Sequence, residues 1–165
     1  MSIDPASQDH DAERRMNTYR EALLMIERLH RRFLDVLKAE LDRTGRTDVN
    51  NVQALILYNI GDDEITIGEL TNRGYYLGSN VSYNIKQLTN NEYIRQERSP
   101  HDRRSVRVSL SDKGRSLRAD ITKLFQRHCA GLFDGGGVSF GELEEMNARL
   151  RRIERFWSEQ VQFRG

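Results

Sequence analysis

A first stripe of mostly apolar residues recurs at alternating steps of three and four positions: Met16, Tyr19, Leu23, Ile26, His30, Phe33 and Leu37. This spacing places the stripe on one face of a long helix, and that face is expected to pack against a partner surface. Gly45, inside the polar run 43–48, ends this helix. The preceding residues, 1–11, are polar and acidic, and they predict a disordered tail.

Two short helices follow. Either Asn50 or Asn51 can cap a helix over 52–60, which is apolar on most sides and is therefore expected to be buried. Thr66 stands three positions before Glu69 in a capping-box pattern, which opens a second short helix.

A fourth helix and a hairpin come next. The helix covers about 79–90, and its apolar face carries Val81, Ile85 and Leu88. Its opposite face is polar without any acidic residue: Ser79, Asn80, Ser82, Tyr83, Asn84, Lys86 and Gln87. Residues 93–98 and 105–110 predict two strands, with a turn over 99–104 that contains Pro and Asp.

Two amphipathic helices end the chain, one leading from Ser111 to the Gly135–Gly137 break and one over 139–161. Ser139 and Glu142 form a capping-box pair at the start of the last helix. Three helices and a hairpin between long flanking helices are the order of a winged helix-turn-helix. The fold class is therefore mainly α with a small β-hairpin wing.

The charge distribution adds one observation. The 165 residues carry a net charge of only +1, but residues 95–118 hold eight basic and three acidic side chains, a local charge of +5. A patch that binds a polyanion shows such a local excess. An ordinary solvated surface is the alternative for a charge run taken by itself.

The run 102–114, DRRSVRVSLSDKG, combines a D-x-R pattern, an alternating strand and an L-S-x-x-G segment. Together with Ile67-Gly68-Glu69-Leu70, Val81-Ser82 and Tyr93-Ile94, it resembles the wing and helix-turn-helix of the MarR (multiple antibiotic resistance regulator) family. The resemblance covers about residues 50–118. It implies a sequence-specific regulator of transcription that binds double-stranded DNA, more typically a repressor than an activator.

Short polar side chains suit a recognition helix, because it must reach base edges in a major groove about 12 Å wide. The DNA-binding candidates there are Ser79, Asn80, Ser82, Tyr83 and Asn84, with Lys86 as a phosphate contact. Thr66, at the start of the preceding helix, is a further candidate.

The wing needs a cation for the narrow, negative minor groove. Arg104 matches the family's wing arginine and is assigned that role, and Asp102 is expected to brace it. Arg98 and Arg103 are expected to contact the DNA backbone.

The flanking helices carry more apolar surface than a small winged-helix core can cover. The resemblance implies that they form a homodimer, which would bind a pseudo-palindromic operator with half-sites about 10 base pairs apart. Similar proteins bind small aromatic or phenolic effectors beside these helices, so Tyr19, His30 and Tyr58 are candidates for an effector pocket. The alternative for each is an ordinary core position.

Other functions find little support. The histidines are scattered without metal-ligand spacing, and no phosphate loop or catalytic Ser motif occurs, so we expect no metal, no cofactor and no enzyme. Cys129 is expected to be a buried free cysteine rather than a redox sensor. A single cysteine, no signal segment and no membrane span predict a cytoplasmic bacterial protein.

The predicted division is a tail (1–11), an N-terminal dimerisation helix (12–48), the DNA-binding domain (49–114) and C-terminal dimerisation helices (115–165). Two alternatives remain beside the specific regulator. One is a non-specific or architectural DNA-binding protein without an effector, and the other is a protein-interaction module that has lost its DNA site.

Overall fold

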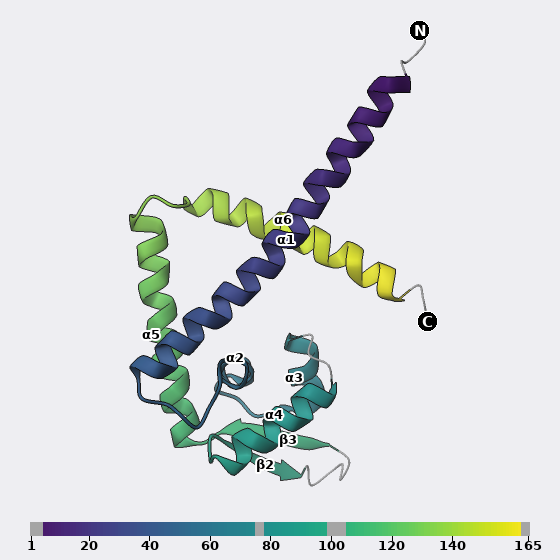
Figure 1. Ribbon diagram of the computed structural model, residues 1–165. Helices are drawn as coiled ribbons and strands as arrows, with labels where there is room; N and C mark the ends of the chain where they lie inside the picture. Colours follow the sequence, from purple (N-terminus) through teal and green to yellow (C-terminus); the bar gives the residue numbers. More distant parts are fainter. Residues whose placement is uncertain (1–4, 75–77, 99–104, 163–165) are drawn as a thin grey trace. The chain divides into compact units, whose positions relative to one another are not determined.

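The structure is a computed structural model that describes residues 5–74, 78–98 and 105–162 (Figure 1). The elements in these ranges are α1 (Pro5–Arg43), α2 (Asn51–Ile60), β1 (Ile65–Thr66), α3 (Ile67–Gly74), α4 (Gly78–Asn90), β2 (Ile94–Arg98), β3 (Val106–Leu110), α5 (Asp112–Asp134) and α6 (Phe140–Gln162). The chain divides into two compact units, Met1–Ile121 and Thr122–Gly165. The predicted fold class, helical with a small winged sheet, is confirmed.

Helix α1 is longer than the sequence predicts. It begins at Pro5, so the structure does not have the disordered tail that was expected over residues 5–11. Proline fits the first turn of a helix, where its missing N–H has no intrahelical partner to lose. Gly45 ends the helix in a left-handed conformation, with φ of 70°, and its N–H donates to the carbonyl of Asp42.

Helix α2 runs through the centre of the first unit. Asn50 is its N-cap, since its side chain accepts a hydrogen bond from the Gln53 N–H at 2.8 Å. The Gln53 side chain in turn accepts from the Asn50 N–H at 3.0 Å, which completes a capping box. Ala54, Leu57 and Ile60 are wholly buried, as expected for a helix that is apolar on most sides.

The sheet has the order β1-β3-β2 and is antiparallel throughout. The predicted hairpin forms β2 and β3, and the two-residue strand β1 adds to the free edge of β3 through Ile65 and Val108. Helices α2, α3 and α4 all contact this sheet. The shared core consists of residues less than 4% exposed: Ile56, Leu57, Ile65, Leu70, Val81, Ile85, Leu88, Tyr93, Ile94, Val108 and Leu110.

The first part of α5, up to Ile121, belongs to the first unit and is held there by two ion pairs. Arg46, in the connection after α1, lies 2.7 Å from Asp120, and Arg118 lies 2.8 Å from Asp62. The α5 residues Leu117 and Ile121 are each 1% exposed and extend the core. These contacts fix the first part of α5 to the connections that precede and follow α2.

Helix α6 belongs to the second unit. Ser139 is its cap, because its hydroxyl oxygen accepts a hydrogen bond from the Glu142 N–H at 3.3 Å. In return, the Glu142 carboxylate accepts from the Ser139 N–H and hydroxyl at 2.8 and 2.7 Å. These two bonds are the leading causes of the lowered pKa of Glu142. Within this single chain, none of the described residues of α6 is buried.

Candidate nucleic-acid interface

The second helix of the helix-turn-helix, α4, has one buried and one exposed face. Val81, Ile85 and Leu88 are at most 2% exposed and hold the helix on the core. The predicted contacts Asn80, Ser82, Tyr83 and Lys86 are all exposed, and Tyr83 is 62% exposed. This surface offers amide, hydroxyl and ammonium groups without a carboxylate. Ser79 begins the same helix, but its side chain lies outside the described residues.

Asn84 does not belong to the exposed face, so its predicted position there is wrong. It is 8% exposed, and its side-chain amide donates to the carbonyl of Asn80 at 2.8 Å. The physical reason is its spacing, three residues after Val81 and four before Leu88, which places it on the apolar side of the helix. The side-chain NH2 group of Asn84 is thus bonded within α4, and its contact with DNA stays a prediction.

The first helix of the pair, α3, starts with the predicted capping box. The Thr66 N–H and hydroxyl donate to the Glu69 carboxylate at 2.7 and 3.1 Å, and the Glu69 N–H donates to the Thr66 hydroxyl. The bonds from Thr66 hold the pKa of Glu69 below its usual value. Thr66 is thus a helix cap, and its contact with DNA stays a prediction.

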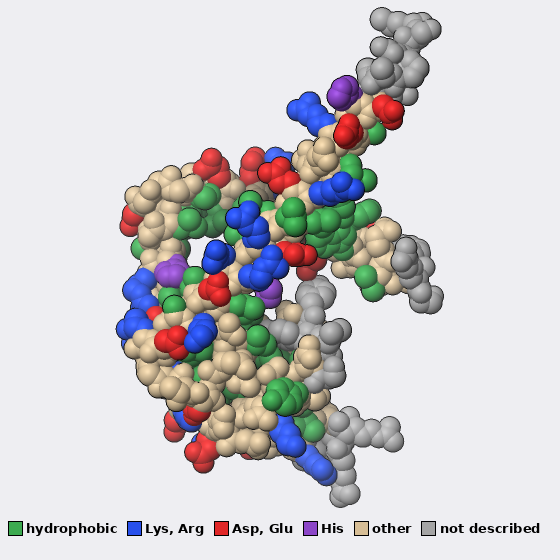
Figure 2. All heavy atoms as spheres, viewed as in Figure 1, with side chains coloured by type: hydrophobic (Ala, Val, Ile, Leu, Met, Phe, Trp, Pro, Cys, Tyr) green, Lys and Arg blue, Asp and Glu red, His purple; other side chains and the backbone are tan. Residues whose placement is uncertain are grey.

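The ribbon formed by β2 and β3 extends beyond the core. In β2, Ile94 is buried and the four following residues, 95–98, are exposed. Arg98 is opposite Val106 at the outer end of the described ribbon, where Figure 2 shows basic side chains. The predicted wing residues Asp102, Arg103 and Arg104 lie outside the described residues, so their roles stay predictions.

The L-S-x-x-G segment anchors the base of this ribbon. The Ser111 hydroxyl donates to the carbonyls of Glu92 and Tyr93 at 2.6 and 3.0 Å, and the Gly114 N–H donates to that same hydroxyl. A Cβ on Gly114 would lie 2.1 Å from the Tyr93 carbonyl oxygen. The glycine therefore lets α5 approach the backbone just before β2, which gives this part of the motif a structural role.

A polar cluster that the sequence did not predict connects the same region. The Asp48 carboxylate accepts from the Tyr93 hydroxyl at 2.6 Å and from the Lys113 ammonium at 2.5 Å. Lys113 also donates to the Asn91 carbonyl and lies 4.3 Å from the centre of the Tyr93 ring. The cluster joins the connection after α1, the start of β2 and the start of α5. Its residues are far apart in the sequence, so no local pattern indicates that they meet.

The effector candidates are not brought together along α1. Tyr19 and His30 are eleven positions apart on one straight helix, which separates them by about 16 Å along its axis. Both are exposed in the single chain, so the predicted core position of His30 is wrong there. Tyr58, on α2, is half-buried, with the Arg118 guanidinium 5.3 Å from its ring centre.

Cys129 is exposed in the single chain, so its predicted burial is wrong there. The described residues contain no group of three or more His, Cys, Asp or Glu side chains placed to hold a metal. Among the described helices, none is long and apolar enough to cross a membrane.

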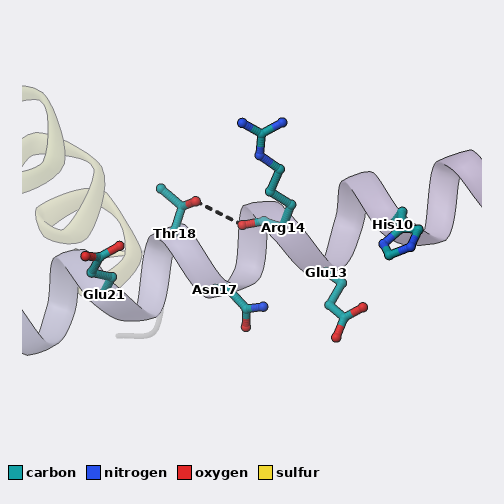
Figure 3. A pocket seen from close by; sticks show the side chains of 6 residues that line it. All are labelled: His10, Glu13, Arg14, Asn17, Thr18 and Glu21. Carbon is teal, nitrogen blue, oxygen red and sulfur yellow. Dashed lines mark hydrogen bonds between the residues drawn. The ribbon is translucent and has the colours of Figure 1, made fainter.

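The outer part of α1 has a shallow depression lined by His10, Glu13, Arg14, Asn17, Thr18 and Glu21. Figure 3 shows Arg14 and Thr18 on one side of the helix and Glu13 and Asn17 on the other. The Thr18 hydroxyl donates to the Arg14 carbonyl of its own helix at 2.9 Å. These polar groups do not converge on one point, so the depression is an open part of the helix surface.

The domain that contains α2 to β3 matches a known family model. Residues 49–114 match the model described as a winged helix DNA-binding domain. The chain is also 37% identical over 161 residues to the exopolysaccharide II synthesis transcriptional activator ExpG of Rhizobium meliloti (strain 1021), covering 98% of this chain and 82% of that relative.

Solved structures show the same fold at lower identity. The transcriptional regulator SlyA matches with a TM-score of 0.74 and 18% identity, over 87% of this chain and 99% of that one. A MarR transcriptional regulator from Methanosarcina mazei Go1 matches with a TM-score of 0.69 and 21% identity, over 84% of this chain and 98% of that one. Streptococcus pneumoniae FabT in complex with DNA matches with a TM-score of 0.67 and 20% identity, over 86% of this chain and 99% of that one. With its helix-turn-helix, its winged sheet and these relatives, the chain belongs to the MarR family of winged helix DNA-binding transcription regulators.

Proposed function

We propose that this protein binds a pseudo-palindromic operator as a homodimer, with α4 of each protomer in a major groove and the wing in the adjacent minor groove. The exposed polar face of α4 carries the proposal, because Asn80, Ser82 and Tyr83 offer the short donors and acceptors that read base edges. Lys86 and Arg98 flank this face with exposed cations that suit phosphate contacts. Arg104 enters the minor groove, and Asp102 holds it.

The homodimer is supported by apolar residues that a single chain leaves exposed. On α1 they include Met16, Leu24, Met25 and Leu29, and on α6 they include Phe140, Met146, Leu150, Phe156 and Val161. Leu24 is 60% exposed and Phe156 is 52% exposed. Two helices with this much uncovered apolar surface suit a self-complementary interface between two copies. The molar mass in solution tests this directly.

The operator is obtained first, by sequencing the genomic fragments that the wild-type protein retains. Arg104→Ala is then expected to weaken operator binding by more than tenfold at fixed salt without changing the dimer. Arg95→Ala is the matched control, because Arg95 is an exposed arginine next to the buried Ile94, at the inner end of β2. This variant removes the same charge and is expected to cost less than threefold. Equal affinities of wild type and Arg104→Ala would contradict the assignment.

Specific recognition separates this function from the architectural alternative. A specific regulator keeps its site against a large excess of bulk genomic DNA, whereas an architectural protein is displaced. Retention of one set of fragments under this competition supports the regulator. Uniform loss of all fragments supports the alternative.

The sense of regulation has two candidates. The sequence resemblance favours repression, whereas the relative ExpG is named a transcriptional activator, which favours activation. A reporter gene behind the retained fragment decides between them, since deletion of the regulator raises expression under repression and lowers it under activation.

A small aromatic or phenolic effector completes the proposal, with Tyr19, His30 and Tyr58 as its candidate contacts. It acts by changing the spacing of the two α4 helices in the dimer, since a ligand shifts a conformational equilibrium only by binding one state more tightly. The expected result is loss of DNA binding with the dimer intact. Dissociation into monomers on ligand addition would contradict this mechanism.

A further inference from the structure

Gln96 occupies an unusual position in β2. Residues that face each other in an antiparallel pair lie on the same side of the sheet, and the register pairs Ile94 with Leu110 and Gln96 with Val108. Leu110 and Val108 are buried, so Ile94 and Gln96 are on the side of the ribbon that faces the helices. An amide therefore stands where strand alternation calls for an apolar residue.

The Gln96 amide has a partner on α4. Its Nε2 donates to the Thr89 hydroxyl oxygen at 2.7 Å, and that hydroxyl donates its own proton to the Ile85 carbonyl at 2.7 Å. Each proton in this chain of two bonds has one acceptor, so the Thr89 oxygen is oriented by both neighbours. Ile85 is 2% exposed and belongs to the buried face of α4. The two bonds thus run from the ribbon to the backbone of the helix.

This connection lies between the two parts of the molecule that the proposed function brings to DNA. Thr89 is in the last turn of α4, six residues after Tyr83 and three after Lys86. Gln96 is two residues before Arg98, on the same side of β2, and residues 99–104 follow directly. Beyond Ile94 the described part of β2 is exposed, so the apolar core does not clamp this stretch of the ribbon.

We propose that Gln96 and Thr89 are positioning residues that set the distance between the recognition helix and the wing. The inference rests on the proposed function, in which one half-site is contacted by α4 and the wing together. A ribbon that moves relative to α4 cannot keep both contacts in register, so loosening the connection reduces binding to the specific site. Non-specific binding depends on phosphate contacts that tolerate such movement.

The test uses near-isosteric changes in the full-length protein. Thr89→Val replaces the hydroxyl by a methyl group, and Gln96→Met keeps the side-chain length without the amide donor. Each is expected to lower affinity for the operator fragment three- to tenfold and to leave affinity for random-sequence DNA within twofold. The double variant is expected to lose no more than the larger single loss, because both changes remove the same bond.

The chain offers two matched controls. Thr71 donates to the Ile67 carbonyl at 2.8 Å in α3, so Thr71→Val removes an equivalent bond within a helix without touching the ribbon. It is expected to leave both affinities within twofold, and Thr89→Ser, which keeps the hydroxyl, is expected to bind as wild type.

Four outcomes overturn the inference. Unchanged operator affinity in Thr89→Val and Gln96→Met shows that the bond does not position the wing. Equal losses on operator and random DNA, or additive losses in the double variant, show a general effect on the fold instead. A wild-type protein that retains no specific fragment overturns the proposed function and this inference with it. If the wild type binds its operator specifically and both variants bind it equally well, only this inference is overturned.

Discussion

The Tyr93 hydroxyl donates a hydrogen bond of 2.6 Å to the Asp48 carboxylate, across 45 positions of sequence. The bond ties the residue that precedes β2 to the connection between α1 and α2. Tyr93 is wholly buried, and Lys113 supplies a second donor to the same carboxylate from the start of α5. The base of the wing is therefore held by side chains from three separate segments, and each can be changed by itself.

Asp48 is expected to make stability depend on acidity. Burial alone would raise its pKa, but the hydrogen bonds from Lys113 and Tyr93 outweigh burial and hold the pKa below its usual value. A carboxylate whose folded pKa is lowered stabilises the fold above its unfolded pKa, near 4, and this contribution is lost as the pH falls through the folded value. Asp48→Asn is expected to cost about 1 kcal/mol at pH 7.

Urea unfolding of the wild type and of Asp48→Asn, measured from about pH 7 down to pH 3, checks this linkage. The difference between the two free energies of unfolding is expected to shrink as the pH falls below the ordinary range of an aspartate. A difference that stays constant over the whole range would mean that Asp48 contributes through packing and not through its charge.

Tyr93 is expected to make stability depend on pH in the opposite direction, with a loss at high pH. Burial, followed by the hydrogen bond with Asp48, raises the pKa of Tyr93 to about 12. The folded state therefore keeps the phenol proton, so this contribution to stability is complete below pH 10 and is lost between pH 10 and about 12. Tyr93→Phe is expected to cost about 1 kcal/mol at neutral pH and to reduce the fall in stability above pH 10. In an absorbance titration, the variant is expected to show one fewer tyrosine that ionises at high pH than the wild type.

Local rules account for most of the first unit. Capping patterns at Asn50 and Thr66 and alternation over 105–110 depend on residues close in sequence, so the elements from α2 to β3 could be predicted within about two residues. The pairing of Ile65 with Val108 could not, because a two-residue strand has no periodicity of its own. It forms only because the edge of β3 offers it hydrogen-bonding partners.

The errors in the site have physical causes too. Asn84 was placed by its polarity, although its spacing from Val81 and Leu88 put it on the buried face, so the correct signal was in the sequence. The apolar neighbours of His30 and Cys129 predict burial, but both residues are exposed in the single chain. Gln96 is a polar residue on the inward side of β2, and this becomes evident only once the register with β3 is known.

Gly114, the glycine of the L-S-x-x-G segment, is expected not to tolerate a side chain. In Gly114→Ala the new methyl group would lie 2.1 Å from the Tyr93 carbonyl oxygen, and a backbone atom cannot move aside as a flexible side chain can. The expected cost is about 3 kcal/mol in the free energy of unfolding. Urea denaturation measures it.

Gly68→Ala is the matched control for this change. Gly68 is helical and exposed, and its new Cβ would meet the Thr66 hydroxyl oxygen at 3.9 Å, which is an ordinary contact. Alanine is favoured over glycine in a helix by roughly 0.5–1 kcal/mol, so this variant is expected to be slightly more stable than wild type. Equal effects of the two substitutions would refute the close approach at Gly114.

Tyr83 and Asn84 are adjacent on α4 and are expected to respond differently to alanine. Tyr83 is 62% exposed on the polar face, so Tyr83→Ala is expected to lower operator affinity five- to fiftyfold, about 1–2 kcal/mol, with little change in stability. Asn84 is 8% exposed and bonded to the Asn80 carbonyl, so Asn84→Ala is expected to cost about 1 kcal/mol of stability. Its effect on affinity is expected to stay below threefold. Binding and unfolding are measured on both variants at the same salt concentration, and a larger loss of affinity in Asn84→Ala than in Tyr83→Ala would reverse the assignment of the two faces.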